Sequence, residues 1–184
     1  MISAPLQQLA FDLSVLGRPS LFVEGAEDKI PTVLSQLSSD STRVAELIFL
    51  DDALAALGGP GDTSVALQIQ IRLDLHTHPA ARPALACVCN RLNQSLGRIG
   101  VFPHSESGLA VVRGLVAWTD RAVPAILAAS ILDSMDELLE VAEPILFAIA
   151  QERMGPDEAE STLATQGWSV PEMPAAPWQK SSQP

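Results

Sequence analysis

The sequence has little cysteine. This scarcity limits the redox chemistry that the protein can perform and bears on the compartment in which we expect it. Only two of the 184 residues are cysteines, and both stand in Cys87-Val88-Cys89. Side chains two residues apart on a helix point in different directions. Neither a disulfide nor a Cys-x-x-Cys redox or zinc pair is therefore available to these two thiols. Reduced thiols are typical of cytoplasmic proteins, so we expect a cytoplasmic location.

Positive charge and long apolar runs are also scarce. The chain has 11 basic and 22 acidic residues, a formal net charge of −11, and its only lysines are Lys29 and Lys180. Proteins that bind nucleic acid or anionic membranes need a positive surface, so we expect neither partner. No apolar run reaches the roughly 18 residues that cross a bilayer. The first eight residues also lack the basic and apolar regions of a signal peptide.

Motifs for catalysis or cofactor binding are nearly absent. The sequence contains no G-x-S-x-G, and the glycine-rich 58–62 lacks the G-K-[ST] ending of a phosphate-binding loop and precedes a strand. One pair remains, His76 and His78, which would share a face of a strand and could hold a metal ion together with His104 and Asp74 or Glu106. The other interpretation is two solvated histidines at the end of a strand. We expect no cofactor and no enzymatic activity. A metal-dependent hydrolase or a small-molecule-binding domain that uses His76, His78 and His104 is the alternative.

The pattern of apolar residues predicts a mixed α and β order. Apolar residues make up 47% of the chain and the mean hydropathy is +0.22, which is enough for a packed core. Helical spacing predicts helices over 2–16, 83–96 and 124–154, the last with Pro144 inside it. Shorter apolar segments predict strands over 21–23, 30–37, 44–50, 65–75, 98–102 and 109–118.

The segment 65–75 is the clearest strand, because its odd positions are apolar while its even positions are mostly polar. Such alternation places one face on a core and the other toward water, as in antiparallel sheets. We therefore predict one α+β domain over residues 1–154, with an antiparallel sheet of about five strands and helices mainly on one face. The last helix should cross the sheet through Leu127, Ile131, Leu138 and Ile145.

The segment 155–184 is rich in proline and shows no apolar period, so we predict a flexible tail that adds little stability. Its tryptophans, Trp168 and Trp178, would then have no place in the core.

Two strands carry apolar residues on both of their faces, namely 47–50 and 111–118. Helices on one side of a sheet cover only one face, so part of these side chains needs another cover. Two interpretations stay open. The strands are central and covered on both sides within the chain, or they form a dimer or client-binding surface.

The order of elements resembles the α+β fold of type III secretion chaperones and the YbjN-type family of sensory transduction regulators. The segment most similar to these families is 82–102, a helix with Asn90 and Asn93 near its end that leads into a strand. The resemblance covers roughly residues 5–152. It implies a protein that binds other protein chains, without catalytic residues, and the chaperone branch is generally acidic, cytoplasmic and dimeric. The strand candidate near Phe22 and the proline-rich tail depart from the pattern.

Residues and resemblance together predict a non-enzymatic protein-binding module, chaperone-like or a regulatory adaptor. We also predict a homodimer. At about 100° per residue, Phe147 falls among acidic positions of the last helix and should face water in a monomer. We expect the dimer interface to include some of Phe147, Trp118 and Val116, because a symmetric pair buries such a patch. The sequence does not identify the client.

Overall fold

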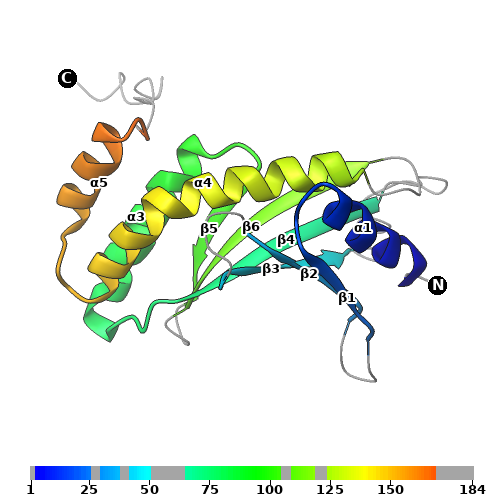
Figure 1. Ribbon diagram of the computed structural model, residues 1–184. Helices are drawn as coiled ribbons and strands as arrows, with labels where there is room; N and C mark the ends of the chain where they lie inside the picture. The colour runs from blue at the N-terminus through cyan, green and yellow to red at the C-terminus, as the bar shows by residue number, and fades with distance from the viewer. Residues whose placement is uncertain are drawn as a thin grey trace, which may run out of the picture.

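The computed structural model describes residues 3–25, 30–37, 42–50, 65–104, 109–118 and 124–168, which form an α+β fold (Figure 1). The helices are α1 (Ser3–Val15), α3 (Arg82–Ser95), α4 (Ala125–Ala150) and α5 (Pro156–Thr165), and a short 3-10 helix η1 (Pro79–Ala81) precedes α3. The strands are β1 (Ser20–Val23), β2 (Thr32–Gln36), β3 (Val44–Phe49), β4 (Val65–Asp74), β5 (Ile99–Pro103) and β6 (Leu109–Trp118). The predicted helical turn near 53–57 and the glycine-rich 58–62 lie outside the described residues.

The strands form one six-stranded sheet in the order β1-β2-β3-β4-β6-β5, and all neighbours are antiparallel. The prediction of an antiparallel α+β fold is confirmed. The sheet has one strand more than the approximately five that we expected, because the short segment around Phe22 pairs with β2. The two longest strands, β4 and β6, pair along ten residues from Val65↔Trp118 to Asp74↔Leu109 in the middle of the sheet.

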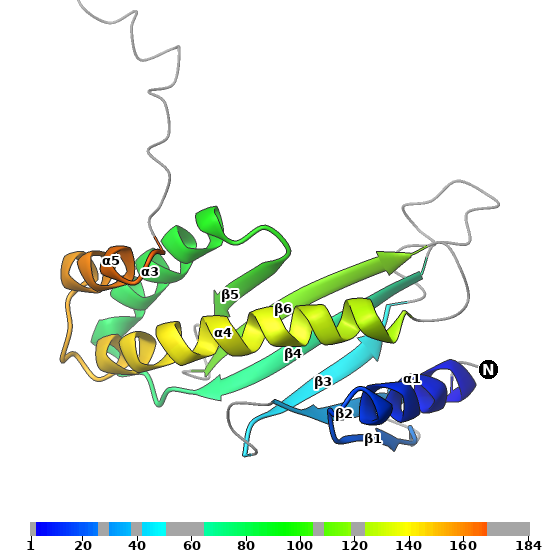
Figure 2. The same ribbon diagram turned by 45° about the horizontal axis from the view of Figure 1, so that its top comes forward.

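The described helices lie on one side of the sheet (Figures 1 and 2). The odd positions of β4 between Leu67 and Leu73 are buried under this helical layer, as their alternation predicts. Helix α4 packs closely against Gly114 of β6. A Cβ atom at Gly114 would lie 2.5 Å from Cγ2 of Ile131, so this position requires glycine.

Helix α4 continues through Pro144, as the renewed apolar period predicts. Ile131, Leu138 and Ile145 are buried in the core, which confirms three of the four predicted contact residues. The prediction for Leu127 is wrong, because its side chain is 41% exposed. The first turn of α4 buries Ala128 instead, so Leu127 projects away from the sheet.

Ion pairs connect the helical layer to the elements around it. Arg18, after α1, contacts Asp133 of α4, and the Nη2 atom of Arg43 lies 2.6 Å from Oε2 of Glu143. Burial lowers the pKa of Arg18, while the nearby Asp136 carboxylate opposes that shift. Because Arg18 stays charged in the folded protein, its buried guanidinium fixes the chain between α1 and β1 to α4.

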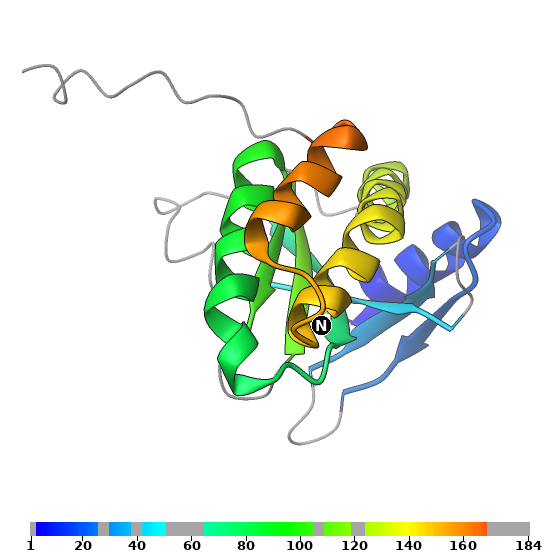
Figure 3. The ribbon, with the colours of Figure 1, turned by 90° about the vertical axis from the view of Figure 1, so that its left-hand side faces the viewer.

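The segment from 155 begins with a helix, so the prediction of a tail without an apolar face is wrong for 156–168. Helix α5 lies beside α3 (Figure 3), and its Ala159 and Leu163 are buried in the same core cluster as the sheet. Trp168 packs partly buried against that cluster, and Arg91 of α3 contacts Glu160. Trp178 and the rest of 169–184 lie outside the described residues.

Candidate functional site: the open face of the sheet

The face of the sheet opposite the helices, here called the open face, carries many apolar side chains. In β3 and β6 the buried positions alternate with less buried ones, and the latter point away from the helical layer. Across the described segments, no helix covers this face (Figure 2). Its apolar members are Leu21, Val23, Leu34, Val44, Ile48, Leu50, Phe102, Val111 and Leu115.

A polar network crosses the middle of the open face. Nε2 of Gln68 donates to Oε1 of Gln70 at 3.0 Å, and Nε2 of Gln70 donates to Oε2 of Glu46 at 2.7 Å. The same carboxylate oxygen accepts a hydrogen bond from Nη2 of Arg72 at 3.1 Å. These bonds leave Gln70 only 8% exposed although no described helix lies over it. The network therefore holds the side chains of β3 and β4 in one arrangement before any partner binds.

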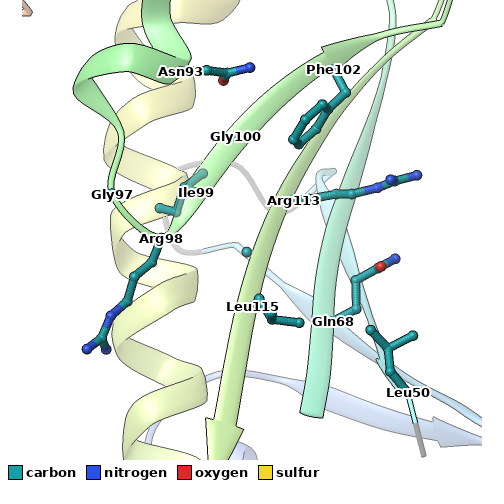
Figure 4. A pocket seen from close by; sticks show the side chains of 11 residues that line it. Leu50, Gln68, Asn93, Gly97, Arg98, Ile99, Gly100, Phe102, Arg113 and Leu115 are labelled. Atoms are coloured by element: carbon teal, nitrogen blue, oxygen red, sulfur yellow. The ribbon is translucent and has the colours of Figure 1, made fainter. Parts of the chain in front are cut away.

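A shallow hollow of about 500 Å³ lies beside this network, at the β5 side of the sheet (Figure 4). Phe102 and Leu115 are 46% and 48% exposed there, and the guanidinium carbon of Arg113 lies 5.7 Å from the centre of the Phe102 ring. In Figure 4 Arg113 extends across β4 toward Gln68, whereas Arg98 points away from it. The hollow is lined by Leu50, Gln68, Asn93, Gly97, Arg98, Ile99, Gly100, Phe102, Arg113, Gly114 and Leu115.

At both edges of the sheet, side chains form hydrogen bonds with backbone groups of the edge strand. On β5, the amide of Asn93 donates to the Val101 carbonyl at 2.9 Å and accepts from the Val101 N–H at 2.6 Å. On β1, the hydroxyl of Ser14 accepts a hydrogen bond from the Ser20 N–H at 3.3 Å. Strand β5 also ends at Pro103, which has no backbone N–H to donate to a neighbouring strand. These contacts disfavour the addition of a foreign strand, so the face of the sheet is better suited to a partner than its edges.

The histidines of the metal hypothesis take separate partners. His76 and His78 follow β4 instead of lying on it. Nδ1 of His76 is 3.2 Å from Asp74, whereas His78 contacts Glu152, just after the end of α4. His104 stands opposite Leu109, which pairs with Asp74, so two strand spacings of about 5 Å separate it from Asp74. Within the described ranges no group of three or more His, Cys, Asp or Glu could hold a metal ion, and Glu106 falls outside them.

The three residues of the predicted dimer interface do not form one patch. Val116 is 6% exposed under the helical layer, so its own chain already covers it. Phe147 is 36% exposed, as its helical position predicts, but the guanidinium of Arg153 lies over its ring at 5.7 Å. Trp118 ends β6 near the start of α4, whereas Phe147 lies 22 residues after the first residue of that helix, a distance of about 33 Å. Nothing is described of the Trp118 side chain.

A second apolar surface lies where the end of α1 meets the start of α4. It consists of Phe11, Val15, Leu16, Ile126 and Leu127, all of them exposed. A hollow of about 360 Å³ separates the two helices there and is lined by Val15, Leu16 and Ile126, among others. This α1–α4 surface lies on the helical side of the molecule, so it is separate from the open face (Figure 2).

Sequence reasoning did not single out Phe102, Arg113 or Gly100. One signal was present, since a glycine inside a strand marks a place where another group approaches the backbone. A Cβ atom at Gly100 would lie 2.7 Å from two atoms of the Phe102 ring, so the ring rests on the bare glycine. The spacing Gly100-x-Phe102 puts both residues on one face, and this could have been read from the sequence.

Comparison with protein-family models finds none that matches the chain, and a search of the curated proteins finds no match either. The resemblance to secretion chaperones and the YbjN-type family therefore stays an expectation from the order of elements. None of the described helices combines the length and the apolar character needed to span a membrane.

Proposed function

We propose that this protein is a non-enzymatic binding module for other protein chains, chaperone-like or a regulatory adaptor, that works in the cytoplasm. One observation carries the proposal: the open face presents apolar side chains of β1, β2, β3, β5 and β6 around a polar network of β3 and β4. Exposed apolar side chains that gather on one face, with polar groups beside them, are a feature of protein interaction sites. The open face is shallow, which suits a segment of protein chain better than a small molecule, because small-molecule sites are concave and enclose their ligand.

Site-specific photocrosslinking tests this proposal with a matched pair of positions. Leu115 on the open face and Leu127 on the α1–α4 surface are similarly exposed, at 48% and 41%. A photoreactive residue at each position would be used to capture proteins from the source cells. A protein captured from 115 is then purified, and its affinity is measured for the wild type, Leu115→Asp and Leu127→Asp. We expect Leu115→Asp alone to weaken binding by tenfold or more, since it buries a charge in the interface.

Two results would overturn the proposal. One is capture from position 115 that does not exceed capture from 127, or a purified partner whose affinity Leu115→Asp leaves unchanged. The other is stoichiometric zinc in untagged protein that is lost in a His76→Ala variant, which would favour the metal-dependent hydrolase. Elemental analysis measures the zinc content directly.

The homodimer stays a prediction. Of the three residues proposed for its interface, Phe147 is the one to substitute, because its side chain is exposed. Sedimentation of the wild type and of Phe147→Asp at micromolar concentration decides it. A wild-type monomer ends the hypothesis, and a dimer that survives Phe147→Asp excludes this residue. In the second case, Ile126→Asp tests the α1–α4 surface, where five apolar side chains are exposed together.

A further inference from the structure

Arg113 and Phe102 lie against each other on the open face. The guanidinium of Arg113 lies over the Phe102 ring at 5.7 Å, and the ring itself rests on Gly100. The two hydrogen bonds between Asn93 and Val101 hold the strand that carries Phe102. Aromatic and arginine side chains in such arrangements dominate the binding energy of many protein interfaces, because they are large and lose little freedom on binding.

No carboxylate of the described residues pairs with Arg113, although the chain has twice as many acidic as basic residues. Within the described segments Arg18, Arg43, Arg72 and Arg91 each pair with a carboxylate. Arg113 is exposed, and its guanidinium lies over the face of Phe102. Glu46, which lies two strands away in the same row of the sheet, is already engaged by Gln70 and Arg72. Arg113 therefore offers its N–H donors to a group from outside the chain.

We infer that the partner of the open face is an extended segment that carries an aspartate or glutamate between apolar residues. Its carboxylate pairs with Arg113 above Phe102, and its apolar side chains occupy the hollow beside Leu115 and Leu50. Guanidinium donors match a carboxylate in a planar, two-point geometry, which fixes the position of the segment along the face. This inference rests on the proposed function and adds the chemistry of the partner.

The net charge of −11 repels an acidic segment from a distance, but only weakly where binding takes place. At physiological ionic strength the screening length is about 8 Å, so the charges nearest the hollow decide the local interaction. Among the described residues that line the hollow, the two charged ones, Arg98 and Arg113, are both positive. A segment with a central carboxylate is therefore preferred there over one with a central lysine.

Selection from a display library of random twelve-residue peptides against the full chain is the experiment. We expect selected peptides to be enriched in Asp or Glu flanked by aliphatic residues. Binding should weaken about three- to tenfold with Arg113→Gln, the worth of one partly exposed charge-assisted pair. A Glu→Gln change in the peptide should cost a similar factor with the wild type and almost nothing with Arg113→Gln, since both changes remove the same contact.

Two further variants separate this pairing from general damage to the surface. Gly100→Ala displaces the Phe102 ring and should weaken the same peptides while the protein stays folded by circular dichroism. Arg153→Gln is the matched control, because Arg153 also lies 5.7 Å from a phenylalanine ring, that of Phe147, but on the helical side. It should leave peptide binding unchanged.

The outcomes distinguish this inference from the proposed function. One outcome overturns the inference and leaves the proposed function standing. In it, the selected peptides lose affinity with Leu115→Asp, but they are not enriched in acidic residues, or the effect of the peptide Glu→Gln change does not depend on Arg113. Enrichment in lysine or arginine overturns it as well. Failure to select any peptide whose binding depends on Leu115 counts against both the inference and the proposed function.

Discussion

The two faces of the sheet are built from the same strands but differ in what covers them. On the helical face, Leu67, Ile69 and Val112 are at most marginally exposed and belong to one core that also includes α4. On the open face, Phe102 and Leu115 are about half exposed, and polar hydrogen bonds rather than helices order the neighbouring side chains. The helical face therefore supplies the stability of the fold, whereas none of the described helices covers the open face.

Two glycines of neighbouring strands show the same difference in detail. At Gly114 the missing side chain admits Ile131 of α4, which is a buried and branched residue. At Gly100 it admits the ring of Phe102, which is exposed and able to swing outward. One glycine serves the packing of the helical layer, and the other serves the shape of the open face.

The largest expected difference in the free energy of unfolding is between two leucine-to-alanine substitutions, one on each face of the sheet. Leu138→Ala removes a side chain that is fully buried on the helical side and should lower the free energy of unfolding by about 2–5 kcal/mol. Leu115→Ala on the open face should change it by less than about 1 kcal/mol, because that side chain is already half exposed. Urea unfolding of both variants measures the difference. Equal losses would show that something in this chain covers the open face.

The second prediction extends the helical core to α5. Leu163→Ala should cost about 2 kcal/mol, near the lower end for a buried leucine, since α5 lies at the border of the core. Thr162→Ala on the exposed side of the same helix is the control and should cost little. A Leu163→Ala variant as stable as the wild type would restore the prediction that residues from 155 onward add no stability.

A third prediction uses the two glycines. Gly114→Ala should destabilise the protein by about 1–3 kcal/mol, because its Cβ would lie within 2.5 Å of a packed Ile131 atom. Gly100→Ala should cost less, since the exposed Phe102 ring can move aside. Thermal unfolding of both variants ranks them. The reverse order would contradict the distinction between the faces.

The last prediction concerns two thiols of α3, and its effect is smallest near neutral pH. Burial raises the pKa of Cys89 to about 12, so this thiol should stay protonated and unreactive toward a thiol reagent at pH 8, while the less buried Cys87 reacts. An unfolded cysteine ionises near pH 8.5, so the folded chain holds one proton more between about pH 8.5 and 12. Stability should therefore fall as pH rises through this window. Cys89→Ala should reduce this slope, and an unchanged slope would assign it to other groups.

The elements that could be predicted well from the sequence are those in which apolar residues recur regularly over a long segment. The alternation over 65–75 and the apolar stripe of the last helix correspond to β4 and α4. Helix α5 was missed because its buried face consists of Ala159 and Leu163 alone, too few for a visible period. Pro156 at its first turn, followed by Asp157 and Glu158, was a start signal that outweighs the proline content of the rest.

The candidate site was predictable only in part. Apolar residues on both faces of 47–50 and 111–118 indicated a surface in need of cover, but left open whether the chain itself supplies it. The structure covers Leu47 and Val116 and leaves Ile48 and Leu115 outward. The pairing of Arg113 with Phe102 depends on the register of β5 against β6, which a single sequence does not specify. The dimer interface stays a prediction, and Phe147 and Trp118 lie near opposite ends of α4.

Methyl NMR of the full chain, titrated with a peptide selected as described above, tests most directly that the open face is the recognition surface. The account predicts shifts confined to the methyl groups of Leu50, Val111 and Leu115, with those of Val15, Ile126 and Leu127 unchanged. Shifts at the α1–α4 surface with none on the open face would contradict it.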